Sequence, residues 1–490
     1  MRGEGSPSDT VLAIVHAEGR TATAFRALGR DMTVVFPEPG SFVAYAEVPG
    51  GVVTAGEPVG PPERLVPVVE AFAAQYTLQD IARHTAQHIT QHAGLQRRRV
   101  TFFATEGRLM QSRRLDRWLI GEQPVWDPRE WAMHLRTHRS LREQLRRAKA
   151  KGVVSHRIDA ACVMQPEWRA AFDALIRRWH ATRSMPAMRF LVDVDLTAGW
   201  PWRRTYVAIR DNRLAGLLSM APVPARRGWL LEHLLRDPDA PNGTAELLVD
   251  HAMRDLSAEH APWATLGLAP LHGPIAPWLT TVRRLSRPLF NFMGLSAFKR
   301  KLRPTSWEPI LMAWPREQAG WRALWDSLRA FAGGPLWRFG VRTIGRGPAP
   351  LLQLLEWLLI PWTLLLAFAP TSPWFPSPHV HAAWVVFDAA LVLALRRLRL
   401  ESSRRGVEAR RRAAQLATGL ALAVSGDAML TMTEALVWNV PHRLGPGGWT
   451  LLLVACLAPA LTAPVLWGAS RRLRILATMP PTCPAPEPTP

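Results

Sequence analysis

The chain has 490 residues, a length that predicts two or three domains rather than one hydrophobic core. Its 60 lysines and arginines outnumber its 39 aspartates and glutamates, and the net charge of +21 favours an anionic partner, either nucleic acid or a membrane surface. The three cysteines, Cys162, Cys456 and Cys483, lie far apart without metal-ligand spacing. This argues against a disulfide framework and against a structural zinc site.

Residues 1–150 alternate strand-like and helix-like segments. The opening MRGEGSPSDTVLAIV lacks the apolar core and cleavage site of a signal peptide, so we expect a cytoplasmic start. SFVAYAEV (41–48) and GVVTAGEPVG (51–60) flank a Pro-Gly-Gly hairpin signal. Helical periodicity over 62–93 and the strand pattern RVTFFAT (99–105) follow. His84, His88 and His92 share one face of that helix, which favours a polar surface over a metal site because no zincin-type glutamate follows His84.

A second cycle of the same composition covers residues 151–335. The strand-like GVVSHRIDAACVM (152–164) precedes a helical pattern over 166–183. RTYVAIRDNRLAGLLSMAPV (204–223) is a predicted hairpin with Asp211 and Asn212 at its turn. Two such cycles predict two mixed α/β halves that meet near residue 150.

A basic helix is predicted at the junction, in RSLREQLRRAKAKG (139–152). Four cations spaced three or four residues apart share one face, namely Arg139, Arg142, Arg146 and Lys149. Leu141, Leu145 and Ala148 occupy another face. The cationic face suits either phosphate contacts or simple solvation, and the pattern leaves both interpretations open.

A crowd of ionisable groups follows the apolar segment near residue 230. Glu232, His233, Arg236, Asp237 and Asp239 lie within eight positions, before the chain breaker Pro-Asn-Gly (241–243) and the amphipathic TAELLVDHAMRDL (244–256). From spacing alone, a well-capped surface turn competes with a site where acid and base groups converge.

Four apolar stretches begin after a basic linker at 336–349: residues 350–370, 381–395, 413–438 and 448–470. Their lengths predict a transmembrane region over 350–470, with the second stretch short unless it starts near Trp374. Eight arginines lie between the second and third stretches. The positive-inside rule therefore places both chain ends and this middle loop in the cytoplasm. The remainder, 471–490, is a predicted Pro-rich cytoplasmic tail.

Ionisable residues within these apolar stretches are candidates for a function inside the membrane. They are Glu356, Asp388, Asp427 and Glu434.

Residues 230–315 resemble the catalytic region of the phosphatidylglycerol lysyltransferase family, also called lysylphosphatidylglycerol synthases or multiple peptide resistance factors. The matching pieces are RDPDAPNGTAELL (236–248), TLGLAPLHG (265–273) and LFNFMGLSAFKRKLRPTSWEPILMAWP (289–315). REQLRRAKAKGV (142–153) and AEVPGGVVTAGEPVGP (46–61) are similar to earlier parts of that domain, so the resemblance covers most of residues 40–335. Two departures stand out: the apolar helices follow the domain, and Glu-His-Leu-Leu (232–235) replaces the usual Asp-Leu-Met-Arg.

The resemblance implies an α/β fold of two tandem GCN5-related-acetyltransferase-like domains, followed by about four transmembrane helices. It implies transfer of an aminoacyl group from aminoacyl-tRNA to a hydroxyl of phosphatidylglycerol at a bacterial cytoplasmic membrane, with no cofactor and no metal. Both implied substrates are polyanions, in agreement with the net charge.

The same resemblance implies roles for the clustered residues. Glu232 or Asp237, with His233 as a substitute, is the expected base for the lipid hydroxyl. Phosphate or the oxyanion is expected to contact three cations: Arg236, Lys299 and Lys301. Asp239 is expected to hold the donor's α-amino group. The remaining expected substrate contacts are Asn242, Trp307 and Glu308, and the cationic face of 139–149 is expected to bind tRNA or lipid phosphate. His272 is either a supporting residue or a plain loop residue.

Two other functions remain open. An acyl-CoA-dependent N-acyltransferase usually carries an Arg-x-x-Gly-x-Gly or Ala loop for pyrophosphate, and no such loop follows RLAGLLSMAPV (213–223). A non-catalytic membrane module that binds lipid is the alternative outside enzyme chemistry.

Overall fold

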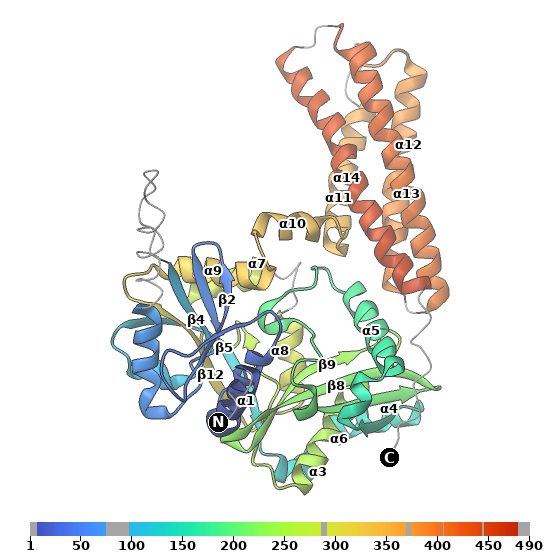
Figure 1. Ribbon diagram of the computed structural model, residues 1–490. Helices are drawn as coiled ribbons and strands as arrows, with labels where there is room; N and C mark the ends of the chain where they lie inside the picture. Colours follow the sequence, from blue (N-terminus) through green and yellow to red (C-terminus); the bar gives the residue numbers. More distant parts are fainter. Residues whose placement is uncertain are drawn as a thin grey trace. The chain divides into compact units, whose positions relative to one another are not determined.

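The computed structural model describes residues 7–74, 98–285, 292–368, 374–404, 406–442 and 445–478 (Figure 1). The chain forms two compact units. The first contains Met1–Ile176 and Ala187–Leu336, and the second contains Arg177–Pro186 and Trp337–Pro481. The predicted histidine face at residues 84, 88 and 92 lies outside the described residues.

One mixed sheet runs through the first unit in the order β1-β2-β3-β4-β12-β5-β10-β9-β8-β7-β6, with β11 paired to β5. The strands are β1 (Thr33–Val35), β2 (Val43–Val48), β3 (Gly51–Ala55), β4 (Arg99–Thr105), β5 (Leu115–Trp126), β6 (Val154–Ile158), β7 (Arg204–Arg210), β8 (Arg213–Val223), β9 (Gly228–Arg236), β10 (Trp263–Thr265), β11 (Ala269–Pro270) and β12 (Ser306–Pro315). The predicted hairpins β2–β3 and β7–β8 are confirmed. Asp211 and Asn212 take positive φ angles of 50° and 54°, as a tight hairpin turn requires.

The strand order shows a duplication in which the two halves exchange their last strands. β3 pairs parallel to β4, and β9 pairs parallel to β10, whereas the other pairs are antiparallel. β5 comes after β4 in the chain but pairs with β10, and β12 comes after β10 but pairs with β4. β5 and β12 then pair with each other along ten residues of β12. The sheet is therefore continuous across residue 150, where the two predicted halves meet.

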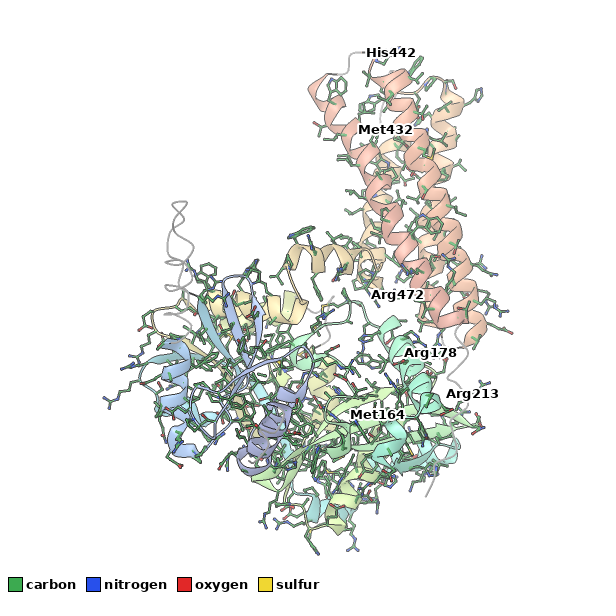
Figure 2. The ribbon with its side chains drawn as sticks, in the orientation of Figure 1. Met164, Arg178, Arg213, Met432, His442 and Arg472 are labelled. Carbon is green, nitrogen blue, oxygen red and sulfur yellow. The ribbon has the colours of Figure 1, made fainter. Side chains whose placement is uncertain are left out.

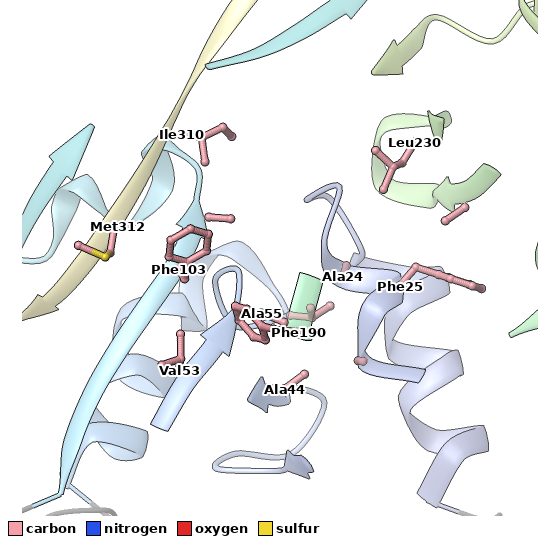
Figure 3. Close-up of a cluster of buried hydrophobic side chains, with 14 of the residues drawn as sticks. Ala24, Phe25, Ala44, Val53, Ala55, Phe103, Phe190, Leu230, Ile310 and Met312 are labelled. Atoms are coloured by element: carbon pink, nitrogen blue, oxygen red, sulfur yellow. The ribbon is translucent and has the colours of Figure 1, made fainter. Parts of the chain in front are cut away.

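Helices cover the sheet in the first unit (Figure 1). They are α1 (Pro7–Glu18), residues 65–74, α3 (Trp131–Thr137), α4 (Arg139–Ala150), α5 (Pro166–Ala181), which ends in the second unit, α6 (Thr244–Ala258), α7 (Pro277–Leu285), α8 (Phe292–Lys301) and α9 (Gly320–Ala332). Because side chains alternate along a strand, the sheet has a core on each face. One core gathers Phe25, Phe103, Leu230 and Ile310 (Figure 3); we call its side the inner face. Leu231, Met220 and Leu302 pack on the outer face, against α6.

The second unit contains α10 (Leu336–Ile344), α11 (Ala349–Phe368), α12 (Pro378–Ser403), α13 (Val407–Glu434) and α14 (Pro446–Thr478). Successive helices α11 to α14 pack side by side, and all four are long and apolar enough to cross a membrane. The alanines of α13, including Ala413, Ala417 and Ala421, are buried in the shared core, where small residues allow close packing. The α/β class with four apolar helices is confirmed. α10 occupies most of the predicted linker, and α14 continues past residue 470.

Gly243 shows how closely α4 and α6 approach each other. It precedes α6 with φ +98°, and a Cβ there would lie 2.4 Å from the carbonyl oxygen of Gln144 on α4. Gly152 has a similar φ of +75°, but a Cβ there would meet nothing within 4 Å. Comparing substitutions at these two glycines therefore separates the cost of a left-handed backbone from the cost of a steric clash.

We expect Gly243→Ala to lower the free energy of unfolding by about 1–3 kcal/mol more than Gly152→Ala does. Both variants carry the left-handed backbone cost of about 1–2 kcal/mol, and Gly243→Ala adds overpacking. Urea unfolding of the full chain, followed by circular dichroism, measures both. Equal losses would contradict the close approach of α4 and α6.

Candidate active site

Arg226 joins three strands on the inner face of the sheet. It lies in the short turn between β8 and β9, and its Nη1 donates to both carboxylate oxygens of Glu308, at 2.9 and 3.1 Å. Its Nη2 donates to Glu106, directly after β4. Gln123 lies opposite Glu308 in the β5–β12 register, and its amide donates to Glu308 at 2.9 Å and to Glu106 at 3.3 Å. We call Glu57, Glu106, Arg108, Gln123, Arg226 and Glu308 the Arg226 network.

Carboxylates outnumber cations in the Arg226 network. Glu57 follows β3 and accepts from Arg108 Nε at 2.6 Å. Burial raises the pKa of Glu57, and the neighbouring Glu106 raises it further. Burial also raises the pKa of Glu106, although Arg226 opposes the shift. Three glutamates thus face two arginines, so the network suits a cation better than an anion.

Trp263 closes one side of this network. The guanidinium carbon of Arg226 lies 4.6 Å from the centroid of the Trp263 ring, a cation–π distance. The indole Nε1 of Trp263 and the Oε2 of Glu57 are buried without hydrogen-bond partners among the described residues. Buried polar atoms are usually satisfied, so these two atoms are candidates for hydrogen bonds to a polar ligand.

Glu232 is held as a carboxylate by an arginine. It lies in the β-bulge of β9, where the register against β8 shifts between Ser219 and Met220. Arg203 Nη1 donates to Glu232 at 2.5 Å. Burial raises the pKa of Glu232, but Arg203 and His233 outweigh it and lower the pKa to about 2. A carboxylate with that pKa is a weak proton acceptor at neutral pH.

His233 follows Glu232 and is 5% exposed. Burial lowers its pKa to about 4, so the ring is neutral at pH 7. Its Nε2 has no hydrogen-bond partner in the described part of the chain, and neither does the hydroxyl of Ser219, which lies opposite it on β8. Ser219 shares a face of β8 with the core residue Ala221. This pair therefore lies on the inner face, as the Arg226 network does.

The Asp-Pro-Asp-Ala-Pro-Asn-Gly turn (237–243) closes on itself. Asp237 accepts the backbone N–H of Asp239 at 2.8 Å, and Arg236 donates to Asn242 at 3.1 Å. Thr244 starts α6 and donates to the Pro241 carbonyl at 2.8 Å. In this geometry the turn leads β9 into α6, and the Asp237 carboxylate and the Asn242 amide bond within the turn.

The two lysines of the expected site, Lys299 and Lys301, make contacts on the outer face of the sheet. Lys299 is 4% exposed, and its ammonium donates to the carbonyls of Leu266, Gly267 and Leu268 at 2.8–2.9 Å. Burial lowers the pKa of Lys299 to about 7. These bonds use all three N–H donors, so Lys299 holds the segment after β10. Lys301 pairs with Glu246 of α6 at 2.8 Å.

Trp307 and His272 form a separate contact on the outer face. Trp307 precedes Glu308 on β12, so its side chain lies on the opposite face of the sheet. The rings of His272 and Trp307 stack with centroids 4.2 Å apart, and His272 Nδ1 lies 2.8 Å from the Glu122 carboxylate. The structure therefore separates the predicted neighbours Trp307 and Glu308.

The basic face of α4 is exposed. Leu141, Leu145 and Ala148 are buried, which confirms the predicted packing face. The exposed cations are Arg139, Arg142, Arg146 and Lys149. Arg142 also donates to the Leu135 carbonyl at 2.6 Å, and Arg146 pairs with Glu143 at 2.8 Å.

Sequence reasoning missed most of the Arg226 network. Glu57 and Glu106 come within two residues of the end of a buried strand, in the sequences TAGE and FATE. Since β3 and β4 are parallel, their carboxyl ends meet at one edge, where ligand groups commonly gather in α/β proteins. That position was a usable signal, whereas no local pattern marks Arg226.

These features place the chain among mixed α/β proteins that carry a helical membrane region. Residues 12–314 match the family described as phosphatidylglycerol lysyltransferase, C-terminal, and the chain belongs to that family. This confirms the family predicted from sequence.

Two solved structures share the fold. The C-terminal domain of a putative lysylphosphatidylglycerol synthetase from Agrobacterium fabrum is 21% identical, with a TM-score of 0.54 over 67% of this chain and 98% of that one. L-PGS from Bacillus licheniformis is 16% identical, with a TM-score of 0.53 over 70% of this chain and 99% of that one. An uncharacterized protein of Corynebacterium glutamicum is 24% identical over 280 residues, which span 55% of this chain and 34% of that protein.

We expect the full chain to lose stability between pH 7 and pH 5 because of His233. The folded pKa of about 4 lies below the ordinary 6.5, so the unfolded state binds the proton first as the pH falls. The loss from His233 alone is about 2 kcal/mol at pH 5, and the raised pKa values of Glu57 and Glu106 act in the opposite direction. Glu232, with its pKa near 2, adds a further loss only below about pH 4.5.

Thermal unfolding of the detergent-solubilised chain at pH 7, 6 and 5 tests this. His233→Gln should remove most of the decrease, whereas His156→Gln, at a half-buried position on β6, should leave it in place. The same decrease in wild type and His233→Gln would exclude His233 as its source.

Proposed function

We propose that this protein is a membrane-bound aminoacyltransferase. It moves an aminoacyl group from aminoacyl-tRNA to a hydroxyl of phosphatidylglycerol or a related lipid. The family match supports a lipid-modifying transferase, and the charge of the Arg226 network supports an aminoacyl donor.

The excess of carboxylates in the Arg226 network is the observation that carries this proposal. An aminoacyl ester carries an α-ammonium group, and a lysyl ester carries a second one on its side chain. Glu57, Glu106 and Glu308 offer these cations more negative charge than Arg108 and Arg226 neutralise. A coenzyme A thioester brings phosphates instead, which the same carboxylates would repel.

The transfer replaces one ester with another, so positioning and proton transfer dominate its catalysis. The lipid hydroxyl attacks the aminoacyl carbonyl carbon and forms the new ester bond, while the bond to the tRNA ribose oxygen breaks. The hydroxyl proton goes to a base, and the ribose oxygen finally takes up a proton. His233 is the base we assign over Glu232, because its pKa of about 4 lies above that of Glu232 and its Nε2, 3.7 Å from Glu232 Oε2, makes no hydrogen bond among the described residues.

The other predicted residues support this arrangement. Glu232 and Arg203 hold the bulge that carries His233, and Asp237 shapes the turn that follows β9. Lys299 holds the segment after β10 through its backbone bonds. Glu232, Asp237 and Lys299 thus position the site, whereas Glu308 contacts the substrate.

A membrane location supports access to a lipid acceptor. The four apolar helices supply the anchor. α9 adds an exposed apolar stripe of Trp321, Trp325 and Leu328 in the first unit, and exposed tryptophans suit the membrane interface. The arginine-rich ends of α12 and α14 support, by the positive-inside rule, a location of both termini and the catalytic unit in the bacterial cytoplasm.

Expression of the full chain should produce new aminoacylated phosphatidylglycerol in the host lipids. Glu308→Gln removes one ammonium partner and should lower that product by about tenfold to a hundredfold. Glu317→Gln, an exposed position just after β12, is the matched control and should match wild type. Lipid mass spectrometry measures the product and identifies the donor amino acid.

An unchanged phosphatidylglycerol pool with wild type would reject this acceptor and direct attention to other lipids. Equal product from wild type and Glu308→Gln would reject the role of the Arg226 network.

The exposed cations of α4 should bind the tRNA. Replacing Arg139, Arg146 and Lys149 with glutamine should raise KM for aminoacyl-tRNA and leave kcat unchanged. Each phosphate contact releases counterions when tRNA binds, so the variant should release fewer of them. The slope of log KM against log salt should therefore fall by about 2.

The control is the triple variant Arg30→Gln/Arg169→Gln/Arg213→Gln. It loses the same charge from exposed positions elsewhere on the first unit. An identical slope change in both triple variants would show that net charge, rather than α4, attracts the tRNA.

A further inference from the structure

The end of α14 carries a cationic cleft within the second unit. The cleft has a volume of about 650 Å³. Its lining includes Gly345, Trp467, Gly468, Arg471, Arg474 and Ile475. Arg472 lies at this end of the helices, and His442 lies at the other (Figure 2). The segment between α10 and α11 contributes Gly345 to this lining.

Close backbone packing forms the floor of this cleft. A Cβ on Gly468 would lie 1.6 Å from the carbonyl oxygen of Gly345, and a Cβ on Gly347 would lie 2.5 Å from the carbonyl oxygen of Val465. Arg472 Nη2 donates to the Gly347 carbonyl at 3.0 Å. The segment 345–347 therefore lies directly on α14, and the cleft is part of the packed helix bundle.

The positive charge of the cleft is not neutralised by the described residues. Arg471 and Arg474 are exposed, and no described carboxylate pairs with them or with Arg346 or Arg472. Arg346 donates to the His180 carbonyl at 2.7 Å, and its Nε has no partner in the described part of the chain. Elsewhere in the same unit, arginines do pair, as Arg399 does with Glu356 at 3.0 Å. The two arginines that line the cleft, Arg471 and Arg474, therefore keep their positive charge available to an anion.

The walls of the cleft specify the kind of anion. Trp467 and Ile475 place apolar surface beside Arg471 and Arg474, and the apolar helix α14 continues from there. A soluble phosphate would use the arginines alone. A phospholipid would use both, with its phosphate on the arginines and its acyl chains along the helix.

We propose that this cleft binds the phosphate head group of an anionic phospholipid. The site lies entirely in the second unit and is separate from the Arg226 network of the first. It therefore does not depend on the proposed transferase activity, and it gives the membrane region a binding role beyond anchoring.

Titration of the detergent-solubilised full chain with phosphatidylglycerol, followed by native mass spectrometry, tests the site without aminoacyl-tRNA. The double variant Arg471→Gln/Arg474→Gln should bind the lipid about thirtyfold more weakly, since each cation near an anionic lipid contributes about fivefold. Arg471→Lys/Arg474→Lys should recover most of the affinity, which separates lost charge from a damaged fold.

Arg396→Gln/Arg397→Gln is the matched control. These exposed arginines lie on α12, and their loss should change the affinity by less than about threefold. Equal weakening in both glutamine variants would overturn the proposal in favour of diffuse surface charge. Equally tight binding of phosphatidylcholine would overturn the requirement for an anion. Equally tight binding of glycerol 3-phosphate would make the cleft a soluble-phosphate site.

Discussion

The pairing of β5 with β12 is the contact on which the rest of the first unit depends. It joins the last strand of each half along ten residues, Ser306–Pro315. Each of these strands also pairs with the other half, through β10 and β4. The halves therefore cannot separate without breaking the centre of the sheet. The same register sets Gln123 opposite Glu308, so the Arg226 network forms only when the strands have been exchanged.

The sequence predicted the local structure well because that structure depends on nearby residues. The β7–β8 turn follows from Asp211 and Asn212, which tolerate positive φ. The buried stripe of α4 follows from helical spacing. The site was less predictable, because Arg226 contacts Glu106 and Glu308 across 120 and 82 residues of sequence. Local patterns carry no information on such pairs.

Two parts of the expected site depend on contacts that the sequence does not reveal. The family resemblance made Trp307 and Glu308 expected substrate contacts, and adjacent strand residues point to opposite faces, so that Trp307 stacks on His272. The resemblance also made Glu232 an expected base, and Arg203, which lies 29 residues away in sequence, holds it ionised.

The charge of the molecule and the charge of its site have opposite signs, and the difference is informative. A net charge of +21 attracts polyanions at long range. The Arg226 network, by contrast, holds three carboxylates against two guanidinium groups. Exposed cations such as those of α4 act at a distance, whereas buried carboxylates act only on a group that enters the site. An aminoacyl-tRNA matches both fields, because it carries a cationic aminoacyl group on a polyanion.

The unpartnered polar atoms of the inner face lower the stability of the fold. Each buried polar atom left without a partner destabilises a fold by about 1–3 kcal/mol. His233 Nε2, Ser219 Oγ, Trp263 Nε1 and Glu57 Oε2 are all of this kind among the described residues. Apolar side chains at these positions would remove that cost, so stability alone does not account for them. A ligand that bonds to them would recover the lost hydrogen-bond energy on binding, which links the instability of the inner face to the proposed recognition of an aminoacyl group.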